Sequence, residues 1–265
     1  MDRCAPLGVY DSGVGGLTVV REIRRQLPAE QIIYLADSAR LPYGDRTPEE
    51  IQLFARQIIT FLRSRGVKMV VMACNTSSAL ALPVVREEFS LPLVGMIEPG
   101  VKTALKMSGE GKIGVIATQG TIDSDAYGRI LRKHGAQVYS QACPKFVPLI
   151  ESGQFNSSQM AQAIDEYLGP LRAAGVDTLI YGCTHYPFLD SQIRAYMGEI
   201  KTVDPAVEAV RQAGRSLAEM DLLSPGKRGR DLFFTTGEPE EFAKRGARLL
   251  GQELDLVEHV DLTRV

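Results

Sequence analysis

Two cysteines in this chain stand where thiols can move protons. Cys74 follows the apolar run VKMVVMA at 67–73, and Cys183 follows VDTLIYG at 176–182, so each ends an expected strand. A thiol with an ordinary pKa of about 8.5 needs only a modest change of surroundings to ionise near neutral pH while its partner stays protonated. One thiolate can then remove a proton from one face of a carbon while the other thiol protonates the opposite face. The pair therefore indicates inversion at a carbon centre.

The segments around the two thiols add hydrogen-bond donors. ACNTS surrounds Cys74 and GCTHY surrounds Cys183 with hydroxyl and amide groups. A hydrogen on a carbon beside a carboxylate is only weakly acidic, so a site that removes it must stabilise the negative charge that develops. The chain shows no lysine motif of the pyridoxal-binding kind. We therefore expect these donors and backbone N–H groups to stabilise the charge without a cofactor.

The same cysteines are compatible with other roles. Either thiol alone suits a buried core position, and the matched pair suits redox chemistry. Cys183 and His185 lie close in sequence, but no other clustered ligand accompanies them and the chain has only three histidines, so no metal is expected. A phosphatase-like thiol is disfavoured because no cation follows either cysteine closely. Cys4 and Cys143 match no motif, and we expect them to be incidental free thiols.

The glycine-rich loop DSGVGGL at 11–17 follows the first expected strand. Its glycines allow a tight turn with backbone amides directed at a ligand, which is typical of a carboxylate or phosphate site. Together with Asp37 it resembles a dinucleotide fingerprint, so a nicotinamide-dependent oxidoreductase is the second candidate class. The match is incomplete, because Thr18 replaces the third glycine and Asp11 places a negative charge beside the pyrophosphate position. A non-catalytic protein that closes two lobes on an amino acid is the third class, and it would not need the thiols.

Short β-branched runs alternate with longer amphipathic segments along the chain. This alternation is typical of parallel α/β architecture. The clearest helix is predicted within TPEEIQLFARQIITFLRSRG, where Thr47 and Glu50 can form a capping box and Gly66 suits the end. A second helix is predicted from Ser158 to near Gly175. The expected strands cover 7–11, 31–37, 67–73, 112–118 and 176–182.

An internal repeat relates the two cysteine segments. FLRSRGVKMVVMACNT and PLRAAGVDTLIYGCTH align without a gap, at the spacing of 109 residues that separates Cys74 from Cys183. A weaker match pairs LGVYDS at 7–12 with IGVIAT at 113–118, 106 residues later. In open α/β sheets, ligands bind beyond the carboxyl ends of the strands. Two facing copies of one unit would therefore bring the thiols to a small ligand from opposite sides.

Length and charge narrow the class of protein. The chain has 265 residues, of which 45% are hydrophobic, enough for two modest domains with a substantial core. Its formal net charge is -2 and no Lys or Arg run could follow a phosphate backbone, so nucleic acid is not an expected partner. MDRCAPLGVYDSG reaches a turn before it forms an apolar signal core, and no later run approaches membrane-spanning length. We therefore expect a cytoplasmic protein that does not enter a membrane.

Four ordered segments resemble the signature segments of the bacterial glutamate racemase family: DSGVGGLTV, DSARLPYGDRTPEEI, ACNTSSA and GCTHYPFL. The resemblance runs from about Gly8 to Gly251, nearly the whole chain. It implies two pseudosymmetric α/β lobes, each a mainly parallel sheet flanked by helices, with the active site between them. It also implies that Cys74 and Cys183 form the catalytic acid/base pair and act without a cofactor. The product, D-glutamate, would supply peptidoglycan synthesis and thus cell-wall biogenesis and cell shape.

The resemblance also assigns further residues to the site. The α-amino and carboxylate groups of the substrate are expected to contact Asp11, Ser12, Tyr43, Gly44, Asn75, Thr76, Thr184 and His185. Four residues are expected to assist the thiols: Asp11, Asp37, Glu151 and His185. Of these, Asp11 and Glu151 are expected beside Cys74. His185 is expected beside Cys183.

The assisting residues also have simpler interpretations. Taken alone, Asp11 suits a turn cap, Asp37 suits an ordinary turn and Glu151 suits a solvated surface carboxylate. His185 has the strongest case, because an imidazole two residues from a thiol can support a thiolate or carry its proton. By resemblance, Cys74 is expected to act on D-glutamate and Cys183 on L-glutamate.

The repeat and the resemblance together predict the domain organisation. The first lobe is expected over 1–97 and 208–265, and the second over 98–207. The return of the carboxyl-terminal part to the first lobe rests on the resemblance, although DLFFTT followed by EPEEFAKRGARLL does indicate a further strand and helix. The family commonly forms dimers, so a homodimer is expected.

Two further points bear on the predicted function. Aspartate racemase is the nearest enzymatic alternative, because related enzymes share the two-thiol chemistry and differ chiefly in how they recognise the side chain. Some members of the family respond to a cell-wall precursor. Because this chain begins almost at its first strand, we expect no such response.

Overall fold

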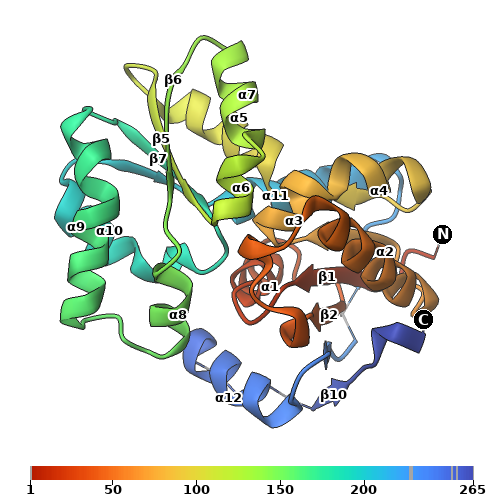
Figure 1. The fold of residues 1–265 in the computed structure, drawn as a ribbon. Helices are drawn as coiled ribbons and strands as arrows, with labels where there is room; N and C mark the ends of the chain where they lie inside the picture. Colours follow the sequence, from red (N-terminus) through yellow and green to blue (C-terminus); the bar gives the residue numbers. More distant parts are fainter. Residues whose placement is uncertain (1, 227–228, 252, 255, 265) are drawn as a thin grey trace.

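Over the residues that the structure describes, 2–226, 229–251, 253–254 and 256–264, the computed structural model contains two parallel sheets flanked by helices (Figure 1). The first sheet has the strand order β10-β9-β2-β1-β3-β4 and the second has the order β6-β5-β7-β8. The strands of the first sheet are β1 (Leu7–Asp11), β2 (Ile32–Ala36), β3 (Met69–Met72), β4 (Leu93–Val94), β9 (Leu232–Thr235) and β10 (Val257–His259). Those of the second are β5 (Lys112–Ala117), β6 (Gln137–Ala142), β7 (Thr178–Gly182) and β8 (Lys201–Val203).

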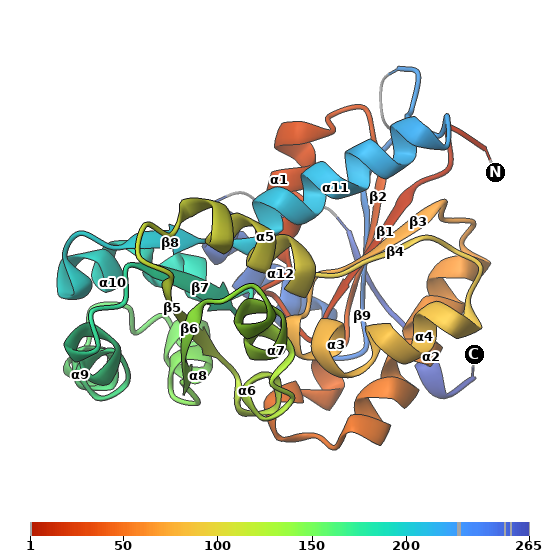
Figure 2. The ribbon, with the colours of Figure 1, turned by 90° about the horizontal axis from the view of Figure 1, so that it is seen from above.

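Helices cover both faces of each sheet. Figure 2 shows α1 and α11 on one face of the first sheet and α2, α3 and α4 on the other. The helices are α1 (Leu17–Gln26), α2 (Pro48–Ser64), α3 (Asn75–Leu80), α4 (Leu82–Glu88), α5 (Ile97–Met107), α6 (Gln119–Asp123), α7 (Ala126–Lys133), α8 (Phe146–Glu151), α9 (Ser158–Ala173), α10 (Asp190–Met197), α11 (Pro205–Glu219) and α12 (Pro239–Leu250). Short 3-10 turns are η1 (Ser38–Arg40), η2 (Tyr43–Asp45), η3 (Tyr186–Leu189) and η4 (Leu262–Arg264).

Local sequence explains why these elements form. Strand β1 is buried on both faces, so Val9 packs into the core beside α1 while Tyr10 packs into the core beside α2. Helix α2 begins with the predicted capping box, in which Glu50 N donates to Thr47 Oγ1 and Thr47 N donates to the Glu50 carboxylate. Gly66 follows it at a φ of 75°, a left-handed conformation that suits glycine at a helix end. The predicted parallel α/β architecture is confirmed.

The two sheets repeat the same strand arrangement. The order β2-β1-β3-β4 in the first corresponds to β6-β5-β7-β8 in the second. The pairing register also repeats, because Leu7 pairs with Met69 and Ile113 pairs with Thr178 at the spacings found in the sequence. The internal repeat is therefore a structural repeat.

One close approach recurs in both copies. A Cβ on Gly8 would lie 3.2 Å from side-chain atoms of Leu62 and Val70. A Cβ on Gly114 would lie 2.9 Å from Leu179, the residue 109 positions after Val70. Glycine at these equivalent strand positions leaves room for the side chains of the neighbouring strand and of the segment before it, which a Cβ would crowd.

The carboxyl-terminal segment joins the first sheet through β9, which pairs with β2, and β10, which pairs with β9. Helix α11 packs on both α1 and α5 and so connects the two lobes. The boundary predicted between residues 207 and 208 falls inside this helix. The division of the chain into lobes at 97 and 207 stays a prediction.

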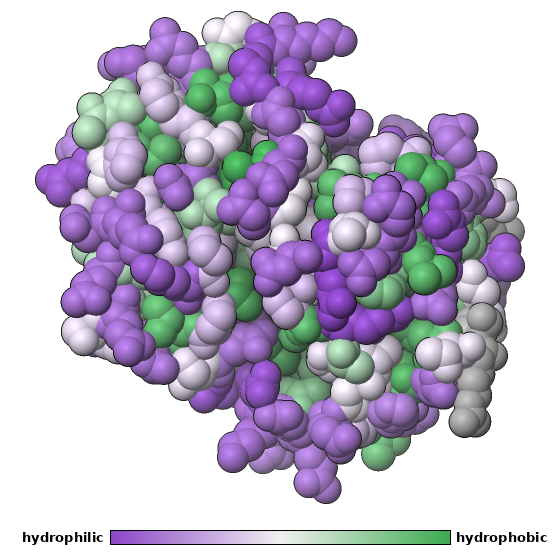
Figure 3. Space-filling model, viewed as in Figure 1, coloured by the Kyte–Doolittle hydropathy of each residue, from purple (hydrophilic) through white to green (hydrophobic). Residues whose placement is uncertain are grey.

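The outer surface is mixed in character. In the part of the chain that the structure describes, no helix has both the length and the apolar character needed to cross a membrane. On the face seen in Figure 3, hydrophilic side chains surround smaller groups of apolar ones.

Candidate active site

A cavity of about 340 Å³ lies between the lobes, at the carboxyl ends of β1, β3, β5 and β7. This volume suits a small ligand. The first lobe contributes Ser12, Leu41, Pro42, Tyr43, Gly44, Asp45, Cys74, Asn75 and Thr76 to its wall. The second contributes Thr118, Gln119, Cys143, Pro144, Val147, Pro148, Glu151, Gly182, Cys183, Thr184 and His185. Both predicted thiols thus face one cavity from different lobes.

Cys74 stands between strand β3 and helix α3. Its Sγ accepts a hydrogen bond from Ser77 N at 3.5 Å, so the thiol caps the helix and its position is set by the backbone. The side chain is buried. Burial and the carboxylate of Asp11 raise the pKa of the Cys74 thiol to about 12, against the lowering effect of the Ser77 N–H. Cys74 therefore holds a proton at neutral pH in the free protein.

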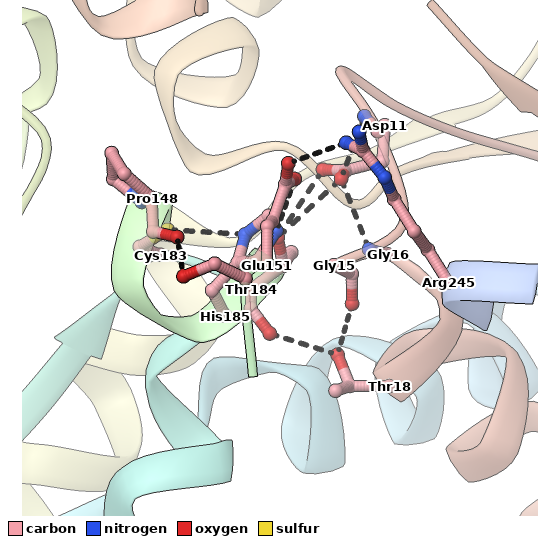
Figure 4. Close-up of polar contacts among 12 residues, drawn as sticks. Asp11, Gly15, Gly16, Thr18, Pro148, Glu151, Cys183, Thr184, His185 and Arg245 are labelled. Atoms are coloured by element: carbon pink, nitrogen blue, oxygen red, sulfur yellow. Dashed lines mark hydrogen bonds and ion pairs between the residues drawn. The ribbon is translucent and has the colours of Figure 1, made fainter. Parts of the chain in front are cut away.

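Cys183 follows strand β7 directly and lies against His185. The Cys183 Sγ and His185 Nδ1 are 3.8 Å apart, and His185 Nε2 lies 3.1 Å from Glu151 Oε1 (Figure 4). Burial alone would lower the pKa of His185, but its hydrogen bonds to Cys183 and Glu151 raise that pKa to about 10. The imidazole is therefore a cation at neutral pH and can donate to both neighbours.

The Glu151 carboxylate makes its contacts on the Cys183 side of the site. It was expected beside Cys74, but its carboxylate instead pairs with His185, on the Cys183 side, and with Arg245 of α12. Burial would raise the pKa of Glu151, but His185 and Arg245 together hold it below its ordinary value. The reason for the difference is tertiary, because α8 brings Glu151 to the loop after β7. Glu151 is only partly exposed, so the simpler interpretation as a solvated carboxylate is wrong.

Asp11 lies under the cavity wall and is fully buried. It is not among the side chains that line the cavity. Its Oδ2 accepts the backbone N–H groups of Gly13 and Gly16 at 3.2 and 3.0 Å. Burial raises the pKa of the Asp11 carboxyl, although His185 and the backbone donors oppose this. Thr184 Oγ1 lies 3.4 Å from Asp11 Oδ1, which links the carboxyl to the second lobe.

The glycine loop therefore differs from its predicted role. The amides of Gly13 and Gly16 were expected to face a ligand, but they bind Asp11 of the same loop. A Cβ on Gly15 would lie 2.3 Å from Thr184 Oγ1 and 2.5 Å from His185 Nδ1. The second lobe thus occupies the space where a dinucleotide-binding loop would hold pyrophosphate.

We expect Gly15→Ala to disturb the Cys183 side of the site. The added methyl group would push Thr184 and His185 away, and displacement of a reacting group by about 1 Å can cost up to about a hundredfold in rate. Steady-state assays should show kcat/KM reduced roughly tenfold to a hundredfold. Gly109→Ala is the matched control, because its Cβ would meet no atom within 4 Å. Equal activities of the two variants would contradict the expectation.

The remaining predicted substrate contacts lie in the cavity wall. Ser12, Tyr43, Gly44, Asn75, Thr76, Thr184 and His185 all line it. Tyr127 OH donates to Asn75 Oδ1 at 2.6 Å, so the Asn75 amide can donate through its NH2 group. Thr76 Oγ1 lies 2.9 Å from Thr118 Oγ1, which joins hydroxyl groups of both lobes.

Asp37 does not reach the cavity wall. Its buried carboxylate accepts the Tyr43 hydroxyl, the Thr236 hydroxyl at 2.9 Å and the Arg40 guanidinium at 2.7 Å. The cause is its place in the sheet, because β1 separates β2 from the strand that ends at Cys74. The Asp37 side chain meets the cavity wall through Tyr43, and its backbone N–H donates to the backbone oxygen of Asp11 at 2.9 Å.

Several residues that line the cavity were not predicted from the sequence. Thr118 follows β5 as Ser12 follows β1, so the 106-residue spacing of the repeat could have found it. Cys143 was expected to be incidental but lies in the cavity wall, fully buried, after β6. Burial raises the pKa of the Cys143 thiol above its ordinary value, so it is protonated at neutral pH. No sequence signal marked Cys143, Pro144 or Val147, because α8 comes to the cavity only through tertiary packing. Cys4 is exposed and does not line the cavity.

The chain is similar to known proteins over nearly its whole length. A family model described as Asp/Glu/Hydantoin racemase matches residues 8–213. Glutamate racemase of Trichodesmium erythraeum is 48% identical over 254 residues, which cover 94% of this chain and 93% of the relative. The crystal structure of a glutamate racemase isoform from Bacillus anthracis aligns with a TM-score of 0.94 and 39% identity, covering 98% of each chain. That of glutamate racemase from Francisella tularensis in complex with D-glutamate aligns with a TM-score of 0.92 and 36% identity, covering 99% of this chain and 100% of the other.

Proposed function

The chain belongs to the Asp/Glu/hydantoin racemase family, and we propose that it interconverts L- and D-glutamate by moving the Cα proton between Cys74 and Cys183. One observation carries this mechanism: the two thiols line a single cavity from opposite lobes, each at the end of an equivalent strand. A planar carbanion between them can be protonated on either face. The two thiols and the residues around them need no cofactor for this transfer.

The proton that Cys74 retains in the free site suits a start from L-glutamate. His185, a cation at neutral pH, donates toward the Cys183 sulfur, so negative charge that develops on this sulfur during the reaction has a counterion beside it. Cys74, with its raised pKa, retains its proton. Cys183 then takes the proton from Cα of L-glutamate, and Cys74 gives its own proton to the opposite face, which yields D-glutamate. The reverse reaction begins with the thiol at Cys183 and the thiolate at Cys74.

Polar groups in the wall can bind the substrate and the charge that develops on it. Hydroxyl groups of Ser12, Thr76, Thr118 and Thr184 line the cavity, together with the Asn75 amide. The imidazolium of His185 adds a positive charge. Donors held in place before the reaction stabilise a developing anion without reorganisation.

The test is incubation of L-glutamate with the purified protein in deuterated buffer without added cofactor. We expect the circular dichroism signal to decay to zero, because the enantiomers have equal free energies, and one deuteron to appear at Cα by mass spectrometry. A parallel sample with L-aspartate addresses the nearest alternative. Decay with aspartate alone would change the substrate, and no decay with either would overturn the racemase proposal.

We also propose the cellular role that the family implies. D-glutamate made in the cytoplasm would supply peptidoglycan synthesis, and the protein would act as a homodimer. The similarity to glutamate racemases over nearly the whole chain supports the cellular role, and the homodimer is proposed from the resemblance to the family.

A further inference from the structure

A chain of charged groups continues beyond His185 to the carboxyl-terminal helix. Arg245 Nη1 lies 3.1 Å from Glu151 Oε2, while Glu151 Oε1 lies 3.1 Å from His185 Nε2. Each carboxylate oxygen of Glu151 therefore has one cationic partner (Figure 4). Arg245 lies on α12, which packs against the first lobe, whereas Glu151 ends α8 of the second.

One contact of Arg245 and one of its neighbour Arg248 hold α12 against Glu151. Its Nη2 donates to Glu241 Oε1 at 2.6 Å, one turn earlier on α12. Arg248, on the same face of the helix, donates to the backbone oxygen of Glu151. Helix α12 thus contacts both the backbone oxygen and the carboxylate of Glu151, at the end of α8.

The contact with Arg245 matters because there is empty space beside the Glu151 carboxylate. A second cavity of about 270 Å³ adjoins the first and shares Leu41 and Glu151 with it. Its wall includes Arg245, Glu241 and Glu238. A carboxylate without Arg245 has room to rotate into this cavity and away from His185.

We propose that Arg245 is a positioning residue for the Cys183 half of the reaction. By holding Oε2 of Glu151, it keeps Oε1 on His185 and thereby keeps the imidazolium on the Cys183 sulfur. The inference rests on the proposed two-thiol function and adds a residue outside the segment that matches the family model, which ends at residue 213. It also makes the Cys183 side of the site depend on contact between the lobes.

The charges around Glu151 determine the sign of the expected pH effect. His185 and Arg245 face its carboxylate as cations, Arg248 contacts its backbone oxygen, and Glu238 and Glu241 lie on the side of α12. Arg245 helps to lower the pKa of Glu151, so its removal should raise that pKa. Because only the ionised carboxylate holds the imidazolium, the acidic limb of the kcat/KM profile should move to higher pH.

The experiment compares Arg245→Met and Arg245→Lys with the wild type and with Arg248→Met, a matched control on the same helix. For Arg245→Met we expect kcat/KM to fall about tenfold, as for loss of a charge-assisted hydrogen bond, and the acidic limb to rise by about half a pH unit. Arg245→Lys keeps the positive charge, so its acidic limb should lie at the same pH as that of the wild type. Arg248→Met should leave the limb in place, because Arg248 contacts only the backbone of Glu151.

A second readout separates the two halves of the reaction. The enantiomers have equal free energies, so kcat/KM must fall equally in both directions. The primary isotope effect with Cα-deuterated substrate should instead rise for the enantiomer that Cys183 deprotonates. Arg245 is 38% exposed, so we expect Arg245→Met to fold, which thermal unfolding would check.

The possible outcomes are distinct. A wild type without glutamate turnover would overturn the proposed function itself. An active wild type with an unmoved acidic limb in Arg245→Met would overturn only the inference about Arg245. Equal shifts in Arg245→Met and Arg248→Met would also overturn it, because contact between the lobes rather than the carboxylate would then be responsible.

Discussion

We expect racemisation to fall by roughly a thousandfold to ten-thousandfold when either Cys74 or Cys183 is replaced by serine. A hydroxyl group is a far weaker acid than a thiol, so serine supplies neither the base nor the acid at neutral pH. Both thiols take part in every turnover in either direction, and each substitution therefore removes both directions. Cys4→Ser is the control, because Cys4 is exposed and does not line the cavity. Circular dichroism measured with each pure enantiomer checks the loss.

Each serine variant should nevertheless retain one half of the chemistry. A glutamate analogue with a leaving group at Cβ needs only proton removal from Cα, after which the leaving group departs. Cys74→Ser, which keeps Cys183, should eliminate from the L-analogue, and Cys183→Ser should eliminate from the D-analogue. Equal preferences in the two variants would contradict the assignment of one thiol to each face. A variant that binds glutamate without turnover would also exclude a purely non-catalytic binding protein, which has no use for the thiols.

The second large effect is expected at His185. His185→Asn keeps a donor near the position of Nδ1 but removes the positive charge between Cys183 and Glu151. We expect kcat/KM near pH 7 to fall roughly a hundredfold to a thousandfold, because the Cys183 thiolate loses its counterion. Steady-state assays from pH 6 to about 10.5 measure the effect.

The shape of the pH profile tests the same residue independently. In the wild type the pKa of His185 is about 10, so its cationic form and the activity that depends on it are lost as the pH rises through about 10. The contribution of the His185–Glu151 ion pair to folding stability changes with pH in the same direction as the activity. It is complete below the ordinary pKa of histidine and is lost as the pH rises through about 10. His185→Asn should lack this alkaline limb, and an identical limb in the variant would assign it to another group.

The sequence by itself determined the architecture and the two thiols. Strand and helix periods are local properties, and a parallel strand delivers the residue after its last position to the same edge of the sheet. Cys183 occupies that position and Cys74 lies one residue beyond it, so their repeat spacing was enough to bring them to one cleft. The same argument places Ser12 and Thr118, at equivalent strand ends, in the cavity wall.

Tertiary structure alone decided which side chains meet the thiols. Glu151 contacts His185 rather than Cys74, and Asp37 stays behind Tyr43, because these partners depend on how α8 and β2 pack and not on local pattern. Arg245 and Glu151 are 94 residues apart and come from different lobes. The periodicity of apolar residues and the spacing of motifs carry no information about such a contact. It forms only because the two lobes pack against each other.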